Sequence, residues 1–346
     1  MKIVVLAGGI STERNVSFSS GAKICTALRS RGHAAVLIDL YLGLQDYPGS
    51  PADIFSAPPA LPGTAIGSVA PDLAAVKKSR RDRSVSVFGP GVLDACKLAD
   101  VVFLGLHGTC GEDGRVQATF DLMGIPYTGS GYLGSAIAMD KDFTKRLVRS
   151  AGVLTPDWSF VTVTAENLSV LTETSPLPCV VKIPDGGSSI GVTLCHSKEE
   201  LADALQGALG TGVLVEQYIA GREFSCGVLD SVGLPPIEII PKVGFYDYVN
   251  KYQTGAAVEV CPADISGSAD EKMRAAAEQV HRLLGLSAYS RSDFIMDAAG
   301  EVYFLEVNTL PGMTPNSLLP QEAAAVGVPY DALCQKIIDL ALKERG

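Results

Sequence analysis

The sequence predicts an α/β protein, in part α+β, in which a parallel sheet near the N-terminus precedes two smaller α+β units. Strands and helices alternate at short intervals in the first third of the chain. Such βα alternation requires crossover connections, which place the strands side by side in a parallel sheet. The last third contains closely spaced strands instead, two of which flank a turn at 297–300 and form a predicted hairpin.

The first third of the chain has regular elements on either side of one interruption. In order, we expect a strand at 3–7, a helix at 13–31, a strand at 35–39, a strand at 101–106 and a helix at 115–123. Gly32 is a suitable residue to end the first helix. Residues 43–92 are rich in Pro, Gly, Ala and Ser, and we expect an irregular insertion there with one short strand near 85–88. No function is assigned to this insertion.

The rest of the chain divides into a middle part and a last part. In the middle part we expect helices at 141–151 and 198–209 and strands at 158–163, 178–183 and 191–195. In the last part we expect strands at 213–218, 223–229, 237–242, 289–296 and 301–307 and helices at 269–284 and 330–344. Ser197 with Glu200, and Ser268 with Glu271, have the spacing of N-terminal helix caps. We therefore expect a domain at 1–130 and two units at 131–215 and 216–346.

The composition and net charge of the chain exclude several classes of protein. Hydrophobic residues make up 47% of the chain and charged residues 19%, which favours a folded protein with a large core. The net charge of −10 and the absence of a long Lys/Arg run argue against binding to nucleic acid or to an acidic membrane by bulk charge. The apolar run at 3–7 is too short for an export signal, and the eight cysteines form no CxxC pair. We therefore expect a cytoplasmic protein with reduced thiols.

The strongest candidate site lies on the predicted hairpin at 289–307. Arg291 and Asp293 lie two residues apart on one strand, and Glu306 and Asn308 lie two apart on the next, so each pair shares a face. Two carboxylates and an amide on adjacent strands are oxygen ligands that suit Mg²⁺. The alternative is a surface hairpin with alternating polar residues. Apolar neighbours on both strands indicate central strands, where acidic side chains need a reason.

A second candidate is the glycine-rich stretch at 185–191, directly after the predicted strand that carries Lys182. Glycines allow backbone N–H groups to approach phosphates, and the lysine adds a positive charge. No Gly-Lys-Ser/Thr follows and no helix starts there, so the stretch is not a Walker A motif. We expect a hairpin lid over phosphates, and the alternative is an ordinary glycine-rich turn.

Three further patterns are weaker. Glu216 and Glu223 lie at strand ends where they suit adenosine, although a solvated strand end is the commoner case. Loops at 8–13 and 107–114 follow strands of the parallel sheet, at the edge where such sheets bind ligands, but structural glycine turns explain them as well. The aromatic stretch at 245–252 suggests either a loop that closes over a site or a packing loop.

Together and in this order, these motifs resemble the ATP-grasp superfamily and, more narrowly, the D-alanine–D-alanine ligase family. The matching stretches are AGGISTERNVS, LHGTCGEDG, YTGSG, MDK, VVKIPDGGSSIGV, VEQYIAGREF, FYDYVNKY, SRSDF and LEVNTLPGMTPNSL. They cover nearly the whole chain, although no single motif is decisive. The resemblance implies an N-terminal pre-ATP-grasp domain and two subdomains that sandwich ATP, in a homodimeric enzyme of peptidoglycan synthesis.

The resemblance also implies a role for each matching residue. The nucleotide would contact Lys141, Lys182, Ser189, Gly191, Glu216, Gln217, Ile219, Glu223, Phe245 and Lys251. Two Mg²⁺ or Mn²⁺ ions would bind Asp293, Glu306 and Asn308. The first D-alanine would be held by Glu13, which Ser188 links to Tyr252, and by His107. Arg291 and the N–H of Gly312 would stabilise an oxyanion, and Ser317 and Leu318 would hold the second D-alanine.

The implied reaction has two steps. The first D-alanine attacks the γ-phosphate of ATP to give an acyl phosphate, and the amine of the second D-alanine then displaces phosphate. Because acyl phosphates hydrolyse, we expect the lid and the aromatic loop to close over them. One departure from the family pattern is that Ile183 separates Lys182 from Pro184, and Asp185 follows. This departure makes the local path of the lid uncertain.

Two alternatives to this function stay open. The first is a D-Ala-D-Ser or D-Ala-D-lactate ligase of the vancomycin-resistance type, although Lys251-Tyr252 resembles the dipeptide-forming members. The second is a non-catalytic ATP-dependent binding protein on the same scaffold. The complete acid triplet and both lysines argue against the second alternative, because simple binding does not require two metal ions at the γ-phosphate.

Overall fold

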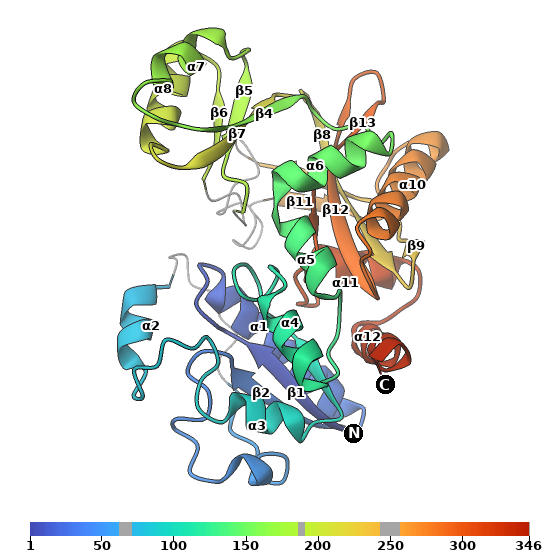
Figure 1. Ribbon diagram of the computed structural model, residues 1–346. Helices are drawn as coiled ribbons and strands as arrows, with labels where there is room; N and C mark the ends of the chain where they lie inside the picture. Colours follow the sequence, from blue (N-terminus) through green and yellow to red (C-terminus); the bar gives the residue numbers. More distant parts are fainter. Residues whose placement is uncertain (62–70, 186–190, 243–256, 346) are drawn as a thin grey trace.

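The computed structural model describes the whole chain except residues 62–70, 186–190, 243–256 and 346. Three sheets of three, four and six strands organise the described residues. Figure 1 shows the three-stranded sheet at the bottom, the four-stranded sheet at the top and the six-stranded sheet on the right, with α5 and α6 beside the six-stranded sheet. None of the helices among the described residues is long and apolar enough to cross a membrane.

The three-stranded sheet is parallel, as expected from the βα alternation. Its strands are β1 (Lys2–Ala7), β2 (Ala34–Asp39) and β3 (Val101–Leu104), in the order β2-β1-β3. Helices α1 (Arg14–Ser30) and α4 (Arg115–Met123) follow β1 and β3. Gly21 lets α1 lie close to the sheet, because a Cβ there would be 2.8 Å from both the Ala7 Cβ and the Leu37 Cδ1. The loops after β1 and β3 therefore emerge together at one edge.

The expected strand near 85–88 is wrong. The described part of the insertion contains a 3-10 turn, η1 (Pro51–Asp53), and α2 (Leu73–Ser79), and α3 (Val92–Lys97) follows it. The buried guanidinium of Arg80 donates to the carbonyl oxygens of Ser86 and Phe88. These carbonyls are thus satisfied by a side chain and not by a neighbouring strand.

The four-stranded sheet is antiparallel and has the order β4-β7-β5-β6. Its elements are β4 (Trp158–Thr162), α7 (Leu168–Thr174), β5 (Cys179–Lys182), β6 (Val192–Cys195), α8 (Lys198–Gly207) and β7 (Gly212–Gln217). The expected cap of α8 is confirmed, since Ser197 Oγ accepts from the N–H of Glu200 at 3.2 Å. Helices α7 and α8 lie together over one face in Figure 1.

The six-stranded sheet is also antiparallel and contains the expected hairpin as two of its strands. Its strands are β8 (Gly221–Leu229), β9 (Val232–Gly233), β10 (Ile237–Pro241), β11 (Ala257–Val260), β12 (Tyr289–Asp297) and β13 (Val302–Asn308). The helices α5 (Tyr132–Met139), α6 (Lys141–Ser150) and α10 (Gly267–Leu283) pack against it. The expected cap at Ser268 is wrong, because Ser266 takes that place and accepts from the N–H of Ala269.

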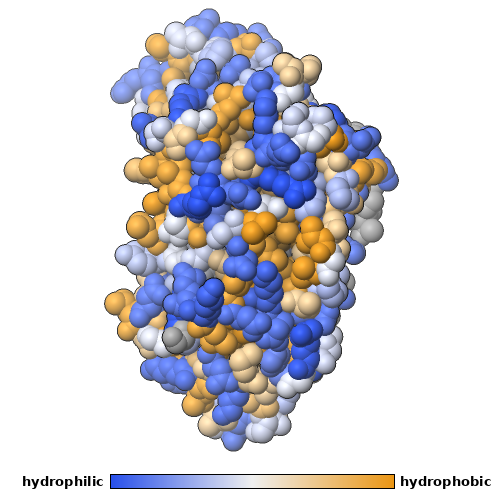
Figure 2. Space-filling view, turned by 90° about the vertical axis from the view of Figure 1, so that its right-hand side faces the viewer, coloured by the Kyte–Doolittle hydropathy of each residue, from blue (hydrophilic) through white to orange (hydrophobic). Residues whose placement is uncertain are grey.

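The end of the chain returns to the first sheet. Helix α11 (Leu318–Ala325) leads to α12 (Tyr330–Arg345), whose Ile337 and Ile338 are fully buried in the same core as β1 and β3. Figure 1 shows α12 beside the N-terminal sheet. On the face shown in Figure 2, hydrophobic residues occur in small groups among hydrophilic ones.

Candidate active site

The four polar residues of the β12–β13 hairpin lie together. Arg291 pairs with Asn308 across the two strands, and Asp293 pairs with Glu306. The guanidinium of Arg291 donates from Nε to Asp293 Oδ1 at 2.9 Å and from Nη2 to Asp293 Oδ2 at 2.8 Å. Asn308 Nδ2 donates to Asp293 Oδ2 at 3.3 Å. The structure thus gathers two carboxylates, an amide and a guanidinium on one face of the sheet.

A serine that the sequence did not indicate supports this group. Ser225 lies opposite Asp293 on the adjacent strand β8, and its hydroxyl donates to Asp293 Oδ1 at 2.9 Å. Asp293 is buried, and its carboxylate accepts hydrogen bonds from Ser225, Arg291 and Asn308. Because Ser225 and Asp293 are 68 residues apart in the chain, local sequence pattern cannot reveal their contact.

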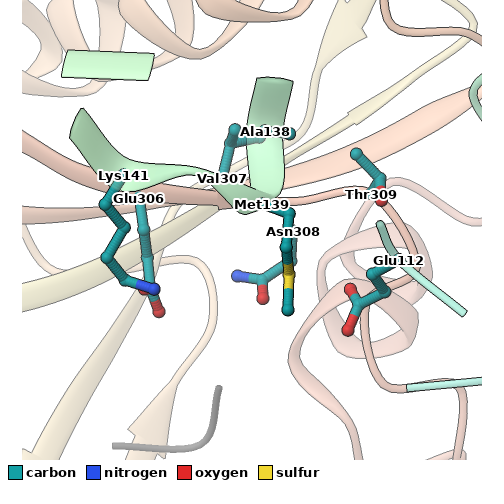
Figure 3. A pocket seen from close by; sticks show the side chains of 8 residues that line it. All are labelled: Glu112, Ala138, Met139, Lys141, Glu306, Val307, Asn308 and Thr309. Atoms are coloured by element: carbon teal, nitrogen blue, oxygen red, sulfur yellow. The ribbon is translucent and has the colours of Figure 1, made fainter. Parts of the chain in front are cut away.

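Helix α6 brings Lys141 to the same place. Lys141 Nζ lies 3.2 Å from Glu306 Oε2, and its backbone N–H donates to the carbonyl of Pro184 at 3.1 Å. This second bond ties the start of α6 to the end of β5, just before the glycine-rich stretch, and Asp185 there is exposed. A pocket beside this pair is lined by Glu112, Ala138, Met139, Lys141, Glu306, Val307, Asn308 and Thr309. Figure 3 shows the side chains of Lys141, Glu306, Asn308 and Glu112 extending to the same side.

Glu216 is held between two lysines on the four-stranded sheet. Lys182 Nζ lies 2.6 Å from Glu216 Oε1, and Lys145 Nζ contacts Glu216 Oε2. Burial raises the pKa of Glu216, but the two ammonium groups outweigh it, so the pKa lies below its usual value. Burial lowers the pKa of Lys145 to about 8, against the opposing effect of Glu216. Sequence reasoning missed Lys145, although its spacing of four from Lys141 on a predicted helix places both on one face.

The two loops of the first domain meet the loop after β13. His107 Nδ1 lies 3.0 Å from the carbonyl of Leu310. Glu112, which the sequence did not single out, accepts from the N–H of Gly108 at 2.7 Å and from that of Leu310 at 3.3 Å. Burial, with a smaller effect of the nearby Glu13, raises the pKa of Glu112 to about 8. Glu13 is itself buried beside Gly108, where a Cβ would lie 3.0 Å from Glu13 Oε2.

Gly312 and Ser317 also lie together. Ser317 is the residue before α11, and its Oγ accepts from the N–H of Thr314 at 3.0 Å. A Cβ at Gly312 would lie 3.0 Å from this Oγ, so glycine allows the close approach. Leu318 is buried with Ile237 of β10. The segment after β13 thus presents a backbone N–H and a serine near the strand that bears Arg291.

Of the remaining residues predicted to contact the nucleotide or the substrate, some lie in the described part of the chain and others lie outside it. Gln217 is exposed at the end of β7, Ile219 is buried and Glu223 is half-buried on β8. Gly191 is exposed and has a φ of +75°, which glycine adopts readily. The five residues that lie outside the described part of the chain are Ser188, Ser189, Phe245, Lys251 and Tyr252.

The donor set fits a magnesium ion. Asp293, Glu306 and Asn308 offer two carboxylates and an amide oxygen, which leaves coordination positions for phosphate oxygens and water. Among the described residues, no group of three or more His, Cys, Asp and Glu side chains is placed to hold a metal.

Solved structures show which class this arrangement belongs to. The D-alanine–D-alanine ligase from Bacillus anthracis complexed with ATP matches with a TM-score of 0.74 and 30% identity, over 100% of this chain and 98% of that one. The ligase from Coxiella burnetii matches with a TM-score of 0.73 and 25% identity, over 100% and 94%. These matches, together with a four-stranded sheet that bears Lys182 and a six-stranded sheet that bears Asp293 and Glu306, define an ATP-dependent ligase with the ATP-grasp fold.

Sequence comparisons narrow the class. Family models described as the D-ala D-ala ligase N-terminus and C-terminus match residues 2–130 and 147–339. The D-alanine–D-alanine ligase of Pediococcus pentosaceus is 44% identical over 342 residues, which are 98% of this chain and 97% of the relative. That of Lacticaseibacillus casei is 42% identical over 346 residues, 99% and 96%. The chain belongs to the D-alanine–D-alanine ligase family.

Proposed function

We propose that this enzyme joins two D-alanine molecules into D-alanyl-D-alanine for peptidoglycan, with conversion of ATP into ADP and phosphate. The observation that carries the proposal is the group formed by Arg291, Asp293, Glu306 and Lys141 on and beside the β12–β13 hairpin. It offers metal ligands, a phosphate-binding lysine and an oxyanion partner within one site. The family membership supports the choice of D-alanine as substrate.

ATP would lie between the four-stranded and the six-stranded sheets. The proposed division of the chain at residues 130 and 215 places Lys182 on one side of the nucleotide and the metal ligands on the other. Glu216, Gln217, Ile219 and Glu223 would line the adenosine pocket, with Ser189, Gly191, Phe245 and Lys251 nearby. Two Mg²⁺ or Mn²⁺ ions, held by Asp293, Glu306 and Asn308, would supply charge neutralisation at the transferring phosphoryl group.

The first D-alanine would bind between the N-terminal loops and the hairpin. Glu13 would pair with its ammonium group, supported by Ser188 and Tyr252, and His107 would contact the substrate from the neighbouring loop. This orientation directs the substrate carboxylate at the γ-phosphate, where Lys141 and Lys182 bind the oxygens. A carboxylate oxygen forms the new bond to phosphorus, ADP leaves, and the product is D-alanyl phosphate.

The second D-alanine would bind beside the segment after β13. Ser317 and Leu318 would hold its carboxylate, which leaves its amine to attack the carbonyl of the acyl phosphate. Arg291 and the N–H of Gly312 would stabilise the oxyanion, and one such donor is typically worth about 3 kcal/mol. The tetrahedral intermediate then releases phosphate, and the amine loses its proton as the peptide bond forms.

The resemblance to the D-alanine–D-alanine ligase family also suggests an oligomeric state and a cellular location for the enzyme. We propose a homodimer in the cytoplasm, where ATP is available, with no nucleic-acid partner and no membrane association. The relatives are named D-alanine–D-alanine ligases, which favours this product over the D-Ala-D-Ser and D-Ala-D-lactate alternatives.

The test is a coupled measurement of ADP release with Mg²⁺ and D-alanine, D-serine or D-lactate, followed by mass analysis of the products. We expect D-alanine alone to support turnover and the product mass to equal that of D-alanyl-D-alanine. Absence of turnover with every D-amino acid would refute the ligase proposal. A mixed dipeptide or a depsipeptide as the main product would replace it with the resistance type.

A further inference from the structure

We propose that Lys145 is a positioning residue for nucleotide binding. Its ammonium group pairs with the Glu216 carboxylate. Lys182 can therefore turn to a phosphate while Glu216 remains paired with Lys145. This inference rests on the proposed contact between Lys182 and the phosphates of ATP. Among the described residues, the ammonium group of Lys145 contacts Glu216 and the Trp158 ring.

The geometry is that of one carboxylate between two ammonium groups. Lys182 Nζ lies 2.6 Å from Glu216 Oε1, and Lys145 Nζ bonds to the other oxygen. The three residues come from three different elements, β5, β7 and α6. All three are buried, with residue exposures of 8% for Lys182, 2% for Glu216 and 0% for Lys145. Little water can therefore compensate a charge that loses its partner.

Counting charges shows what Lys145 contributes. The group has two positive charges and one negative charge, so it is positive overall. Without Lys145, Glu216 and Lys182 would neutralise each other, and the group would offer a phosphate no net attraction. Moving Lys182 to the phosphate would then also leave a buried carboxylate without a cation, which is unfavourable. With Lys145 present, Glu216 keeps one partner when Lys182 moves.

The position of Lys145 is fixed by its surroundings. Its Nζ lies 4.9 Å from the centre of the Trp158 ring, a cation–π contact, and Trp158 Nε1 donates to Asp142 Oδ1 at 2.7 Å. The Lys145 side chain is only 1% exposed. Lys145 therefore acts on a nucleotide through Glu216 and Lys182, not through direct contact.

The test is direct binding of ADP and of adenosine to the full-length protein, measured by calorimetry. Lys145→Met removes the ammonium group and keeps most of the stem. Lys145→Gln keeps a hydrogen-bond donor for Glu216 and serves if the Met variant does not fold. For each we expect ADP to bind on the order of tenfold more weakly, while adenosine, which has no phosphate, binds as in the unmodified protein.

Two further variants separate this role from general support of the fold. In Lys182→Met the phosphate contact is already lost, so Lys145→Met added to it should weaken ADP binding less than it does in the unmodified protein, because only the net charge of the group then changes. Arg149→Met is the matched control. Arg149 lies one turn further along α6, 4.3 Å from the Trp158 ring, and pairs with Asp157, so its removal should leave ADP binding unchanged.

Three results would overturn the inference. One is unchanged ADP binding in both Lys145 variants. Another is an equal loss of adenosine binding, which would indicate damage to the adenosine pocket. The third is additive loss in the double variant, because independent effects add. An unmodified protein that binds ADP but releases none from ATP with D-alanine would refute the ligase proposal alone, and the Lys145 inference would stand.

Discussion

Glu322 is a buried carboxyl group that fits its place only because residue 227 is a glycine. Its Oε2 accepts from the N–H of Gly227 at 2.8 Å, and its Oε1 has no hydrogen-bond partner within the described part of the chain. Burial holds the pKa of Glu322 well above its usual value. A Cβ at Gly227 would overlap Glu322 Oε2 and Leu319 Cδ1. Gly227 also lies opposite Arg291, so this packing supports the strand beside the site.

We expect Gly227→Ala to lower the free energy of unfolding by about 1–3 kcal/mol, the usual cost of overpacking a core. Shortening Glu322 should relieve the overlap with its carboxylate, although not that with Leu319, so Gly227→Ala with Glu322→Ala should be more stable than Gly227→Ala alone. Urea denaturation of the three proteins measures both effects. Equal losses for the single and the double variant would show that the two residues do not compete for space.

His281 makes the stability of the fold depend on acidity. It is buried at the end of α10, and its Nδ1 lies 2.7 Å from Ser290 Oγ. Burial, with a smaller effect of Arg282, lowers the pKa of His281 from 6.5 to about 4. The unfolded chain therefore binds a proton between pH 6.5 and 4 that the folded protein does not bind, so the contribution to stability falls as pH falls through this window.

We expect this loss to reach roughly 3 kcal/mol by pH 4, since one pKa unit corresponds to about 1.4 kcal/mol. His281→Asn keeps a neutral hydrogen-bonding group near Ser290 and cannot take up the proton. Its free energy of unfolding should change less between pH 6.5 and 4 than that of the unmodified protein, as measured by urea denaturation at each pH. Parallel curves for the two proteins would contradict the assignment.

At the scale of elements, α6 connects the two antiparallel sheets. Lys141 and Lys145 lie four residues apart on one face of this helix, and they pair with Glu306 and Glu216, which belong to different sheets. The helix also binds the carbonyl of Pro184 at the end of β5. Helix α6 thus fixes the four-stranded and six-stranded sheets relative to each other, and we propose that ATP binds between these sheets.

We expect Glu306→Gln to reduce D-alanine-dependent ADP release on the order of a hundredfold or more, because an amide is a weaker metal ligand than a carboxylate. The amide oxygen can still accept from Lys141, so the melting temperature should stay near that of the unmodified protein. Glu301→Gln is the matched control on the same hairpin, since Glu301 is exposed and forms a surface ion pair with Lys272 at 3.4 Å. Full activity of the Glu306 variant would refute the proposed metal site.

Sequence periodicity predicted most of the regular elements, because apolar spacing and caps are local properties. Helix α11 was missed because Pro320 lies in its first turn, where proline is tolerated but reads as a helix breaker. The residues of the hairpin site could be predicted from their spacing. The contact of Ser225 could not, because its partner Asp293 lies 68 residues away in the chain, and the same holds for the pairing of Lys145 with Glu216, 71 residues away, although the spacing of Lys145 from Lys141 was a local signal.

At the scale of the whole molecule, the C-terminal segment joins the first sheet to the site. The loop after β13 contacts His107 and Glu112 of the N-terminal domain, and α12 then packs into the core of that domain. The residues that we propose bind the ammonium group, the metal ions and the oxyanion thereby come from distant parts of the chain, and the loop after β13 brings them together. In the proposed reaction, the first D-alanine, held at this site, gives its carboxylate oxygen to the γ-phosphate.

Oxygen labelling tests this step most directly. D-alanine labelled with ¹⁸O in both carboxylate oxygens is incubated with ATP, Mg²⁺ and the enzyme, and the phosphate released is analysed by mass spectrometry. We expect one ¹⁸O atom in each phosphate, because the oxygen that forms the acyl phosphate leaves with phosphorus when the second D-alanine attacks. Phosphate without ¹⁸O, released together with D-alanyl-D-alanine, would rule out the acyl phosphate.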